Sequence, residues 1–177
     1  MANPLYDNLI GKHATNDACF LRQPGKPTVS FRQFSERTSQ VANLLLKHGL
    51  KPGDRVAVQA SKTVEMVILY GATIQAGGVF LSLNTDYKKD EISYFIKDAS
   101  PKIFVCDPQK RKELEQITGQ VGSQVLTLDK NGQGSLQSQA NILSKTFNTI
   151  DRRPDDLVAL LYTSGTTGRS KGAMLTQ

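Results

Sequence analysis

Short apolar runs alternate along this chain with longer stretches in which apolar residues recur every three or four positions. The short runs are typical of buried strands, and the recurring spacing is typical of helices with one buried face. Strands are predicted at residues 18–21, 28–29, 55–60, 79–83, 103–106, 125–128, 157–161 and 173–175. Helices are predicted at residues 5–10, 30–48, 63–75, 90–98, 109–117 and 137–145. This order predicts an α/β fold with a mostly parallel sheet flanked by helices on both faces.

The helix after Ser30 carries signals at both of its ends. Ser30 and Gln33 have the spacing of a capping box, and Gly49 is a residue type that ends helices. The buried face of this helix is predicted to contain Phe34, Val41, Ala42 and Leu45. Residues 129–138, in contrast, are polar and rich in turn residues, so they are predicted to form an exposed loop.

The segment YTSGTTGRSKG, residues 162–172, directly follows the apolar run 157–161. It contains three glycines, five Ser or Thr hydroxyls and two cations in eleven residues. Glycines let a loop present its backbone N–H groups, and hydroxyls and cations add hydrogen bonds and positive charge. A Gly- and Thr-rich hairpin turn is the alternative, but this density of donors favours a polyphosphate site. The candidate residues are Thr163, Ser164, Gly165, Thr166, Thr167, Gly168, Arg169, Ser170 and Lys171.

This segment is not a Walker A motif. That motif places Lys directly after Gly, continues with Ser or Thr, and opens a helix. Here two residues separate Gly168 from Lys171, and Gly172 follows the lysine. Since residues 173–175 are apolar, the predicted geometry is strand, phosphate loop, strand.

The segment resembles the phosphate-loop signature of the adenylate-forming enzymes, which include acyl-CoA synthetases, peptide-synthetase adenylation domains and luciferases. Residues 75–84, QAGGVFLSLN, are similar to a second stretch of that family, although Ser82 stands where relatives usually have Pro. Residues 29–34, VSFRQF, are similar to an early helix entry of the family. The resemblance covers nearly the whole chain, in the family's order.

The resemblance implies that residues 1–177 are the N-terminal portion of an AMP-binding domain, ending just after the phosphate loop and lacking the C-terminal domain. It implies ATP-dependent activation of a carboxylate to an acyl-adenylate, followed by thioester formation with coenzyme A. The candidate residues would hold the β- and γ-phosphates together with Mg²⁺, with Lys171 neutralising charge and Arg169 assisting or pointing to solvent. No residue is assigned as a catalytic acid, base, nucleophile or metal ligand, so the fragment alone is predicted to be inactive.

Within the family, several segments resemble malonyl-CoA synthetases. Most members carry Pro before the loop lysine, whereas this chain has Arg169, Ser170 and Lys171 in succession. Residues 83–87, 94–99 and 103–108 agree with the same group. Malonate is therefore the expected acid. A medium-chain or aromatic acyl-CoA ligase and a non-catalytic phosphate-binding fragment are the alternatives.

The distribution of charged and apolar residues bears on the partners and the location of the protein. The net charge is +6, but the cations are dispersed beside acidic residues without interleaved aromatics, which disfavours nucleic-acid binding. No run approaches the length of a membrane span, and the N-terminus lacks a signal pattern, so a cytoplasmic location is expected.

Cys19 and Cys106 lie in apolar segments and are predicted to be buried thiols. Apolar surface that meets the absent part of the protein is expected to favour self-association.

Overall fold

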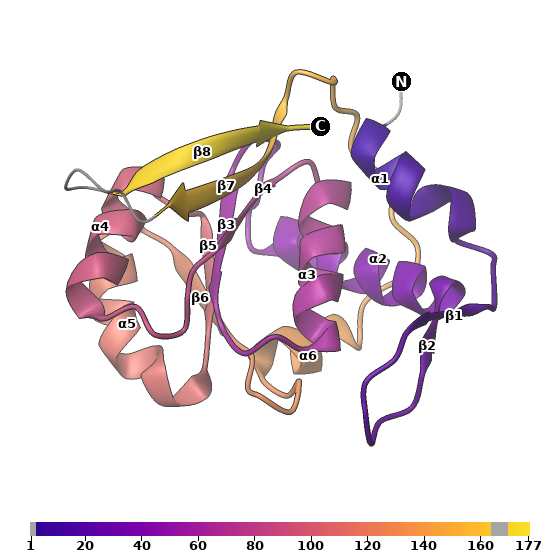
Figure 1. Cartoon of the computed structure of the whole chain (residues 1–177), viewed down its shortest axis with the longest axis horizontal. Coiled ribbons are helices and arrows are strands. Elements are labelled where there is room, and N and C mark those ends of the chain that lie inside the picture. The colour runs from indigo at the N-terminus through magenta and orange to yellow at the C-terminus, as the bar shows by residue number, and fades with distance from the viewer. Residues whose placement is uncertain (1–2, 164–169) are drawn as a thin grey trace.

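A six-stranded mixed sheet forms the centre of the molecule, in the order β6-β5-β3-β4-β7-β8 (Figure 1). The computed structural model describes residues 3–163 and 170–177. Neighbouring strands run parallel except for β7 and β8, which are antiparallel. The strands are β3 (Arg55–Gln59), β4 (Val79–Ser82), β5 (Ile103–Cys106), β6 (Gln124–Thr127), β7 (Leu157–Thr163) and β8 (Lys171–Thr176). The predicted α/β class with a mostly parallel sheet is confirmed.

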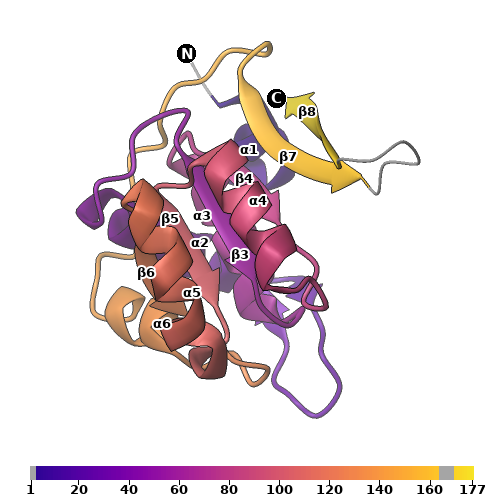
Figure 2. The same cartoon turned by 90° about the vertical axis from the view of Figure 1, so that its left-hand side faces the viewer.

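Helices cover both faces of the sheet. On one face α2 (Phe31–Lys47), α3 (Val64–Gln75) and α6 (Ser135–Ala140) contribute to one buried apolar cluster. On the other face α4 (Lys89–Ala99) and α5 (Arg111–Thr118) build a second cluster, and Figure 2 shows these two helices in front of the strands. The remaining elements are α1 (Pro4–Leu9), η1 (Gly11–His13), η2 (Pro108–Lys110), η3 (Gly119–Val121) and the antiparallel pair β1 (Cys19–Leu21) and β2 (Val29–Ser30).

The ends of α2 follow from its sequence. Ser30 Oγ accepts a hydrogen bond from the Gln33 N–H at 3.2 Å, and Gln33 Oε1 accepts one from the Ser30 N–H at 3.0 Å. These two bonds satisfy backbone donors that the first helical turn leaves open, and they confirm the capping box. At the other end Gly49 adopts φ +79°, a left-handed conformation that glycine accepts without strain.

Strand β3 is central in the sheet and is buried on both faces because helices pack against each of them. Val56 and Val58 pack into the cluster of α2 and α3, as their alternation predicts. Ala57 belongs to the opposite cluster, beside Phe104 and Leu81, and all three are fully buried. Central strands of parallel sheets are enclosed on both sides, so alternation alone does not reveal their second buried face.

The prediction of an exposed loop at residues 129–138, followed by a helix at 137–145, is wrong in its boundaries. Asp129 closes a tight turn, since its Oδ1 accepts from the N–H groups of Asn131 and Gln133, both at 2.8 Å. Helix α6 then begins at Ser135 and ends at Ala140. The fully buried Leu136 draws this segment into the core, which explains why its polar composition was misleading.

Side chains of α2 hold the chain that follows α6. The Gln40 side chain of α2 donates to the carbonyls of Asn141 at 3.0 Å and Leu143 at 3.1 Å. Asn43 donates to the carbonyls of Ser144 and Thr146 in the same way. Because side chains of α2 satisfy these carbonyls, residues 141–146 need no continuation of the helix.

The two cysteines differ from each other, which corrects the prediction that both are buried. Cys106 is fully buried at the end of β5, whereas Cys19 is exposed, and both thiols are free. Burial raises the pKa of the Cys106 thiol to about 12, so its reactive thiolate is scarce near neutral pH.

We therefore expect only Cys19 to react with a thiol reagent at pH 8 in the folded protein, and both cysteines to react after denaturation. An Ellman titration of the native and urea-unfolded protein measures this directly. The matched Cys19→Ser variant should lose the fast native reaction. Rapid modification of Cys106 in the folded state would contradict the burial described here.

Candidate functional site

The predicted phosphate segment lies between β7 and β8, and the described residues confirm the two flanking strands. Thr163 is the last residue of β7 and pairs with Lys171, the first residue of β8. Thr163 Oγ1 donates to the Lys171 carbonyl at 3.4 Å. Thr163, Ser170 and Lys171 are thus brought together. The other candidates, Ser164, Gly165, Thr166, Thr167, Gly168 and Arg169, lie outside the described residues.

The hairpin of β7 and β8 extends beyond the parallel part of the sheet. Strand β4 pairs with β7 only at Ala159 and Leu160, so the stretch from Leu161 to Thr163 has β8 as its partner. Parallel strands of α/β proteins bind ligands at their carboxyl ends. The end of β7 and the start of β8 therefore lie at the edge of the sheet where such ligands bind (Figure 1).

The ammonium group of Lys171 is available to a ligand. The residue is exposed, and none of the carboxylates in residues 3–163 and 170–177 forms an ion pair with it. A cation without a partner on a hairpin can attract an anion without first breaking an internal contact.

Helix α4 contacts both sides of the hairpin, which the sequence analysis did not anticipate. Tyr94 Oη donates to the Ser170 carbonyl at 3.1 Å, and Tyr162 Oη donates to the Asp98 carboxylate. Burial raises the pKa of Tyr162, and the hydrogen bond to Asp98 raises it further. The phenol therefore stays protonated near neutral pH and remains a donor. The four-residue spacing of Tyr94 and Asp98 on a helix was the signal available in the sequence.

A recess of about 580 Å³ lies at the carboxyl ends of β3 and β4. From these neighbouring strands the chain leaves toward opposite faces, into α3 and α4, which is the arrangement of a topological switch point. The lining residues are Ala60, Ser61, Lys62, Met66, Ser82, Leu83, Asn84 and Thr85. Ser82, the departure from the family pattern, thus faces a cavity, and this cavity was not predicted from the sequence.

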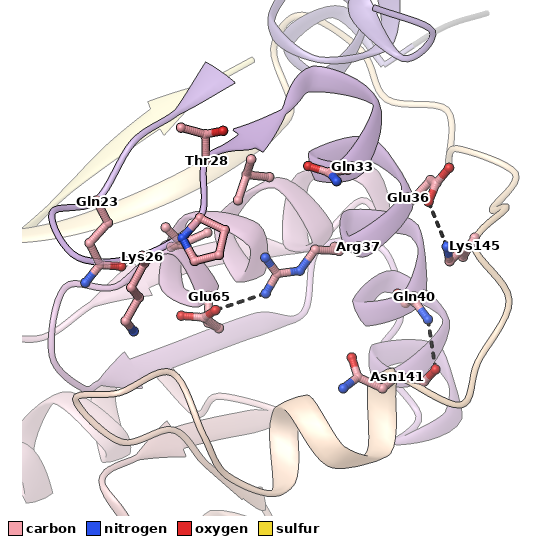
Figure 3. A pocket seen from close by; sticks show the side chains of 13 residues that line it. Gln23, Lys26, Thr28, Gln33, Glu36, Arg37, Gln40, Glu65, Asn141 and Lys145 are labelled. Atoms are coloured by element: carbon pink, nitrogen blue, oxygen red, sulfur yellow. Dashed lines mark hydrogen bonds and ion pairs between the residues drawn. The ribbon is translucent and has the colours of Figure 1, made fainter. Parts of the chain in front are cut away.

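A second cavity, of about 520 Å³, lies between the β1–β2 hairpin and helices α2 and α3 (Figure 3). Its charges are largely compensated, since Arg37 pairs with Glu65 and Lys145 pairs with Glu36, each at 2.9 Å. Lys26 donates to the backbone carbonyl of Asn131. Because these cations already have partners, this cavity is a poorer phosphate site than the hairpin.

Across the described part of the chain, no group of three or more His, Cys, Asp or Glu side chains is placed to hold a metal ion. Among the same residues, no helix combines the length and apolar character needed to cross a bilayer.

The family profile described as AMP-binding enzyme matches residues 11–177. The chain therefore belongs to the AMP-binding enzyme family, and the resemblance to adenylate-forming enzymes is confirmed.

Among solved structures, MatB from Rhodopseudomonas palustris is similar in its apo and its ATP-bound forms. Each form has a TM-score of 0.95 and 48% sequence identity, covering 99% of this chain and 35% of MatB. Tyrocidine synthase 2 from Brevibacillus parabrevis is 37% identical over 147 residues, which are 83% of this chain and 4% of that protein. Enterobactin synthase component F from Escherichia coli O157:H7 is 32% identical over 151 residues, 10% of its length. This chain thus spans about a third of MatB and much less of the two synthases.

Proposed function

We propose that the whole protein containing this chain activates a carboxylic acid with ATP and then transfers the acyl group to coenzyme A. Membership of the AMP-binding enzyme family supports an AMP-forming ligase. The observation that carries the proposal is the β7–β8 hairpin, which has the phosphate-loop sequence and at its base an exposed Lys171 that forms no ion pair with residues 3–163 or 170–177. The similarity to ATP-bound MatB at 48% identity supports ATP as the nucleotide.

The roles of the candidate residues follow from charge and geometry. Lys171 neutralises the β- and γ-phosphates, so that pyrophosphate leaves as the carboxylate attacks the α-phosphate. Thr163, Ser164, Thr166, Thr167 and Ser170 supply hydroxyl donors, Gly165 and Gly168 supply backbone freedom, and Arg169 adds positive charge. Mg²⁺ enters with ATP as part of the substrate and screens the phosphate oxygens.

In-line displacement requires positioning and charge neutralisation more than covalent chemistry from the protein. A phosphate-binding hairpin without a catalytic acid, base or nucleophile is consistent with this step. The remaining groups, including those that recognise the acid and coenzyme A, are proposed to belong to the rest of the protein. The enzyme is proposed to act in the cytoplasm, without a nucleic-acid or membrane partner.

Malonate is the proposed acid, because residues 83–87, 94–99 and 169–171 resemble malonyl-CoA synthetases. We expect the whole enzyme to form acyl-CoA fastest from malonate in a panel with methylmalonate, acetate, medium-chain fatty acids and hydroxycinnamates. Pyrophosphate release without coenzyme A reports adenylation, and AMP release with coenzyme A reports thioester formation, so the two measurements separate the steps. Preference for a long-chain or aromatic acid would refute malonate and leave the ligase class standing. Absence of AMP formation with every acid would refute the ligase itself.

The 177-residue chain serves as a control in the same panel. We propose that it forms no acyl-CoA and binds ATP weakly, at about millimolar Kd, which corresponds to about −4 kcal/mol. Its outer hairpin exposes Leu161, Met174 and Leu175, with 45%, 69% and 43% of their surfaces accessible. This apolar surface supports self-association of the isolated chain.

A further inference from the structure

Helix α4 holds the base of the phosphate hairpin at two points. Its Tyr94 hydroxyl donates to the carbonyl of Ser170, and its Asp98 carboxylate accepts from the hydroxyl of Tyr162. Tyr162 immediately precedes Thr163, and Ser170 immediately precedes Lys171. The two contacts therefore fix the chain at the residue before Thr163 and at the residue before Lys171.

Tyr94 and Asp98 can act together because they are four residues apart on one helix. Side chains at this spacing lie on the same helical face, so a single face of α4 meets both strands of the hairpin. The partners are distant in sequence, 76 residues apart for Tyr94 and Ser170 and 64 for Asp98 and Tyr162. Neither contact therefore arises from local chain geometry.

Aromatic packing stiffens the same junction. The ring of Phe95, which is 1% exposed, lies 4.4 Å from the Tyr162 ring and 5.0 Å from the Tyr87 ring, centroid to centroid. The Tyr94 and Tyr162 rings meet edge to face at 6.4 Å. Rings packed at these distances restrict side-chain rotation, so the hydroxyl of Tyr162 is held toward its acceptor.

Helix α4 is itself tied to the central strand at both of its ends. At the C-terminal end, Arg55 of β3 donates from Nε to the Ala99 carbonyl at 2.6 Å and from a terminal nitrogen to the Ser100 carbonyl at 3.0 Å. Before the N-terminal end, the buried Gln59 of β3 donates to the carbonyls of Asn84 at 3.0 Å and Tyr87 at 3.1 Å. A buried strand thus fixes the helix that holds the hairpin.

The outer end of the hairpin has few contacts with the core of the protein. All six residues of β8 are exposed, so the core does not enclose this strand. Residues Leu161–Thr163 lie beyond the pairing of β7 with β4. The contacts from α4 act at this projecting end, close to Lys171.

We infer that Tyr94 and Asp98 are positioning residues for the ATP phosphates, acting through Ser170 and Tyr162. This inference rests on the proposed function. Neither side chain touches the reacting atoms. Each holds one side of the hairpin, next to Thr163 or Lys171, so that the Lys171 ammonium is positioned for the leaving pyrophosphate.

The test uses the whole enzyme and the variants Tyr94→Phe and Asp98→Asn. Each replacement keeps the shape of the side chain and removes a hydroxyl donor or a charge. We expect each to lower kcat/KM for ATP in acid-dependent ATP–pyrophosphate exchange by about tenfold. Tyr94→Phe loses a well-placed hydrogen bond, and Asp98→Asn replaces a charge-assisted bond with a weaker neutral one. The KM for the acid and the melting temperature should stay close to their wild-type values.

Tyr87→Phe is the matched control. Tyr87 packs against the same Phe95 ring, but its hydroxyl makes no hydrogen bond to any residue in the described ranges, so its loss should leave kcat/KM unchanged. A double-variant cycle of Tyr162→Phe with Asp98→Asn adds a second readout. If the hydroxyl and carboxylate act as one contact, the double variant should be no worse than the more impaired single variant.

Wild-type kinetics in both Tyr94→Phe and Asp98→Asn would overturn the positioning roles. A loss that follows the melting temperature, or that raises the KM values for ATP and acid equally, would overturn them as well. If the wild-type enzyme shows no acid-dependent exchange, the proposed function fails. If the wild type shows this exchange and both variants have wild-type kinetics, only the inference about Tyr94 and Asp98 fails.

Discussion

Lys171→Ala in the whole enzyme is expected to slow acid-dependent ATP–pyrophosphate exchange by about 10²–10³-fold, the cost of removing one preorganised charge from a developing anion. Lys171 is the first residue of β8, pairs with Thr163 and is exposed. Its ammonium therefore stands at the base of the phosphate segment and is free to neutralise the pyrophosphate. Lys171→Arg should recover only part of the rate, because a planar guanidinium does not reproduce a compact ammonium charge.

Lys145→Ala is the matched control for this prediction. Lys145 is also an exposed cation, but it pairs with Glu36 beside the cavity of Figure 3. Loss of an exposed ion pair costs about 0–1 kcal/mol of stability and removes no charge from the hairpin. Exchange at the wild-type rate in Lys171→Ala, or an equal loss in Lys145→Ala, would contradict the assignment of Lys171.

Gly134→Ala is expected to lower the free energy of unfolding by about 3 kcal/mol or more, because it combines backbone strain with an atomic overlap. Gly134 has φ +150° and ψ −175°, a region that only glycine populates readily. A Cβ atom there would lie 2.2 Å from the Thr127 carbonyl oxygen and 2.6 Å from its carbon. These are backbone atoms of β6, so no side-chain rotation can relieve the overlap.

Gly122→Ala separates the two contributions. Gly122 has φ +70°, and a Cβ atom there would have no neighbour within 4 Å. Only the left-handed conformation is then penalised, at about 1–2 kcal/mol. Urea denaturation followed by circular dichroism measures both variants. Equal losses of stability would show that the approach to Thr127 contributes nothing.

Local patterns predicted most elements of the fold correctly. Helix α2 is the clearest case. Its capping box joins two residues that are three positions apart, and its end depends on the backbone conformation of a single glycine. Prediction failed for residues 129–145, where the buried Leu136 and carbonyl acceptors for Gln40 and Asn43 determine the path of the chain. Such contacts come from elements about 100 residues away, 101 in the case of Gln40 and Asn141.

The candidate site divides in the same way. Its chemistry was readable because glycines, hydroxyls and a lysine were concentrated in one segment, and the hairpin geometry followed from the apolar runs on either side. The support of that hairpin by α4 was not predicted from the sequence. Tyr94 and Asp98 appear in the sequence as ordinary helix residues, and only the crossing of α4 beside β7 and β8 gives them partners.

The sequence by itself determined most of the elements, the caps of α2 and the concentration of glycines, hydroxyls and cations in residues 162–172, because these depend on near neighbours along the chain. The tertiary structure alone decided the strand order, the burial of β3 on both faces, and the exposure of Cys19 in contrast to Cys106. It also decided the support of the hairpin by α4. The physical reason is that burial and side-chain hydrogen bonds require surfaces from distant segments to meet, and local preferences do not specify which surfaces those are.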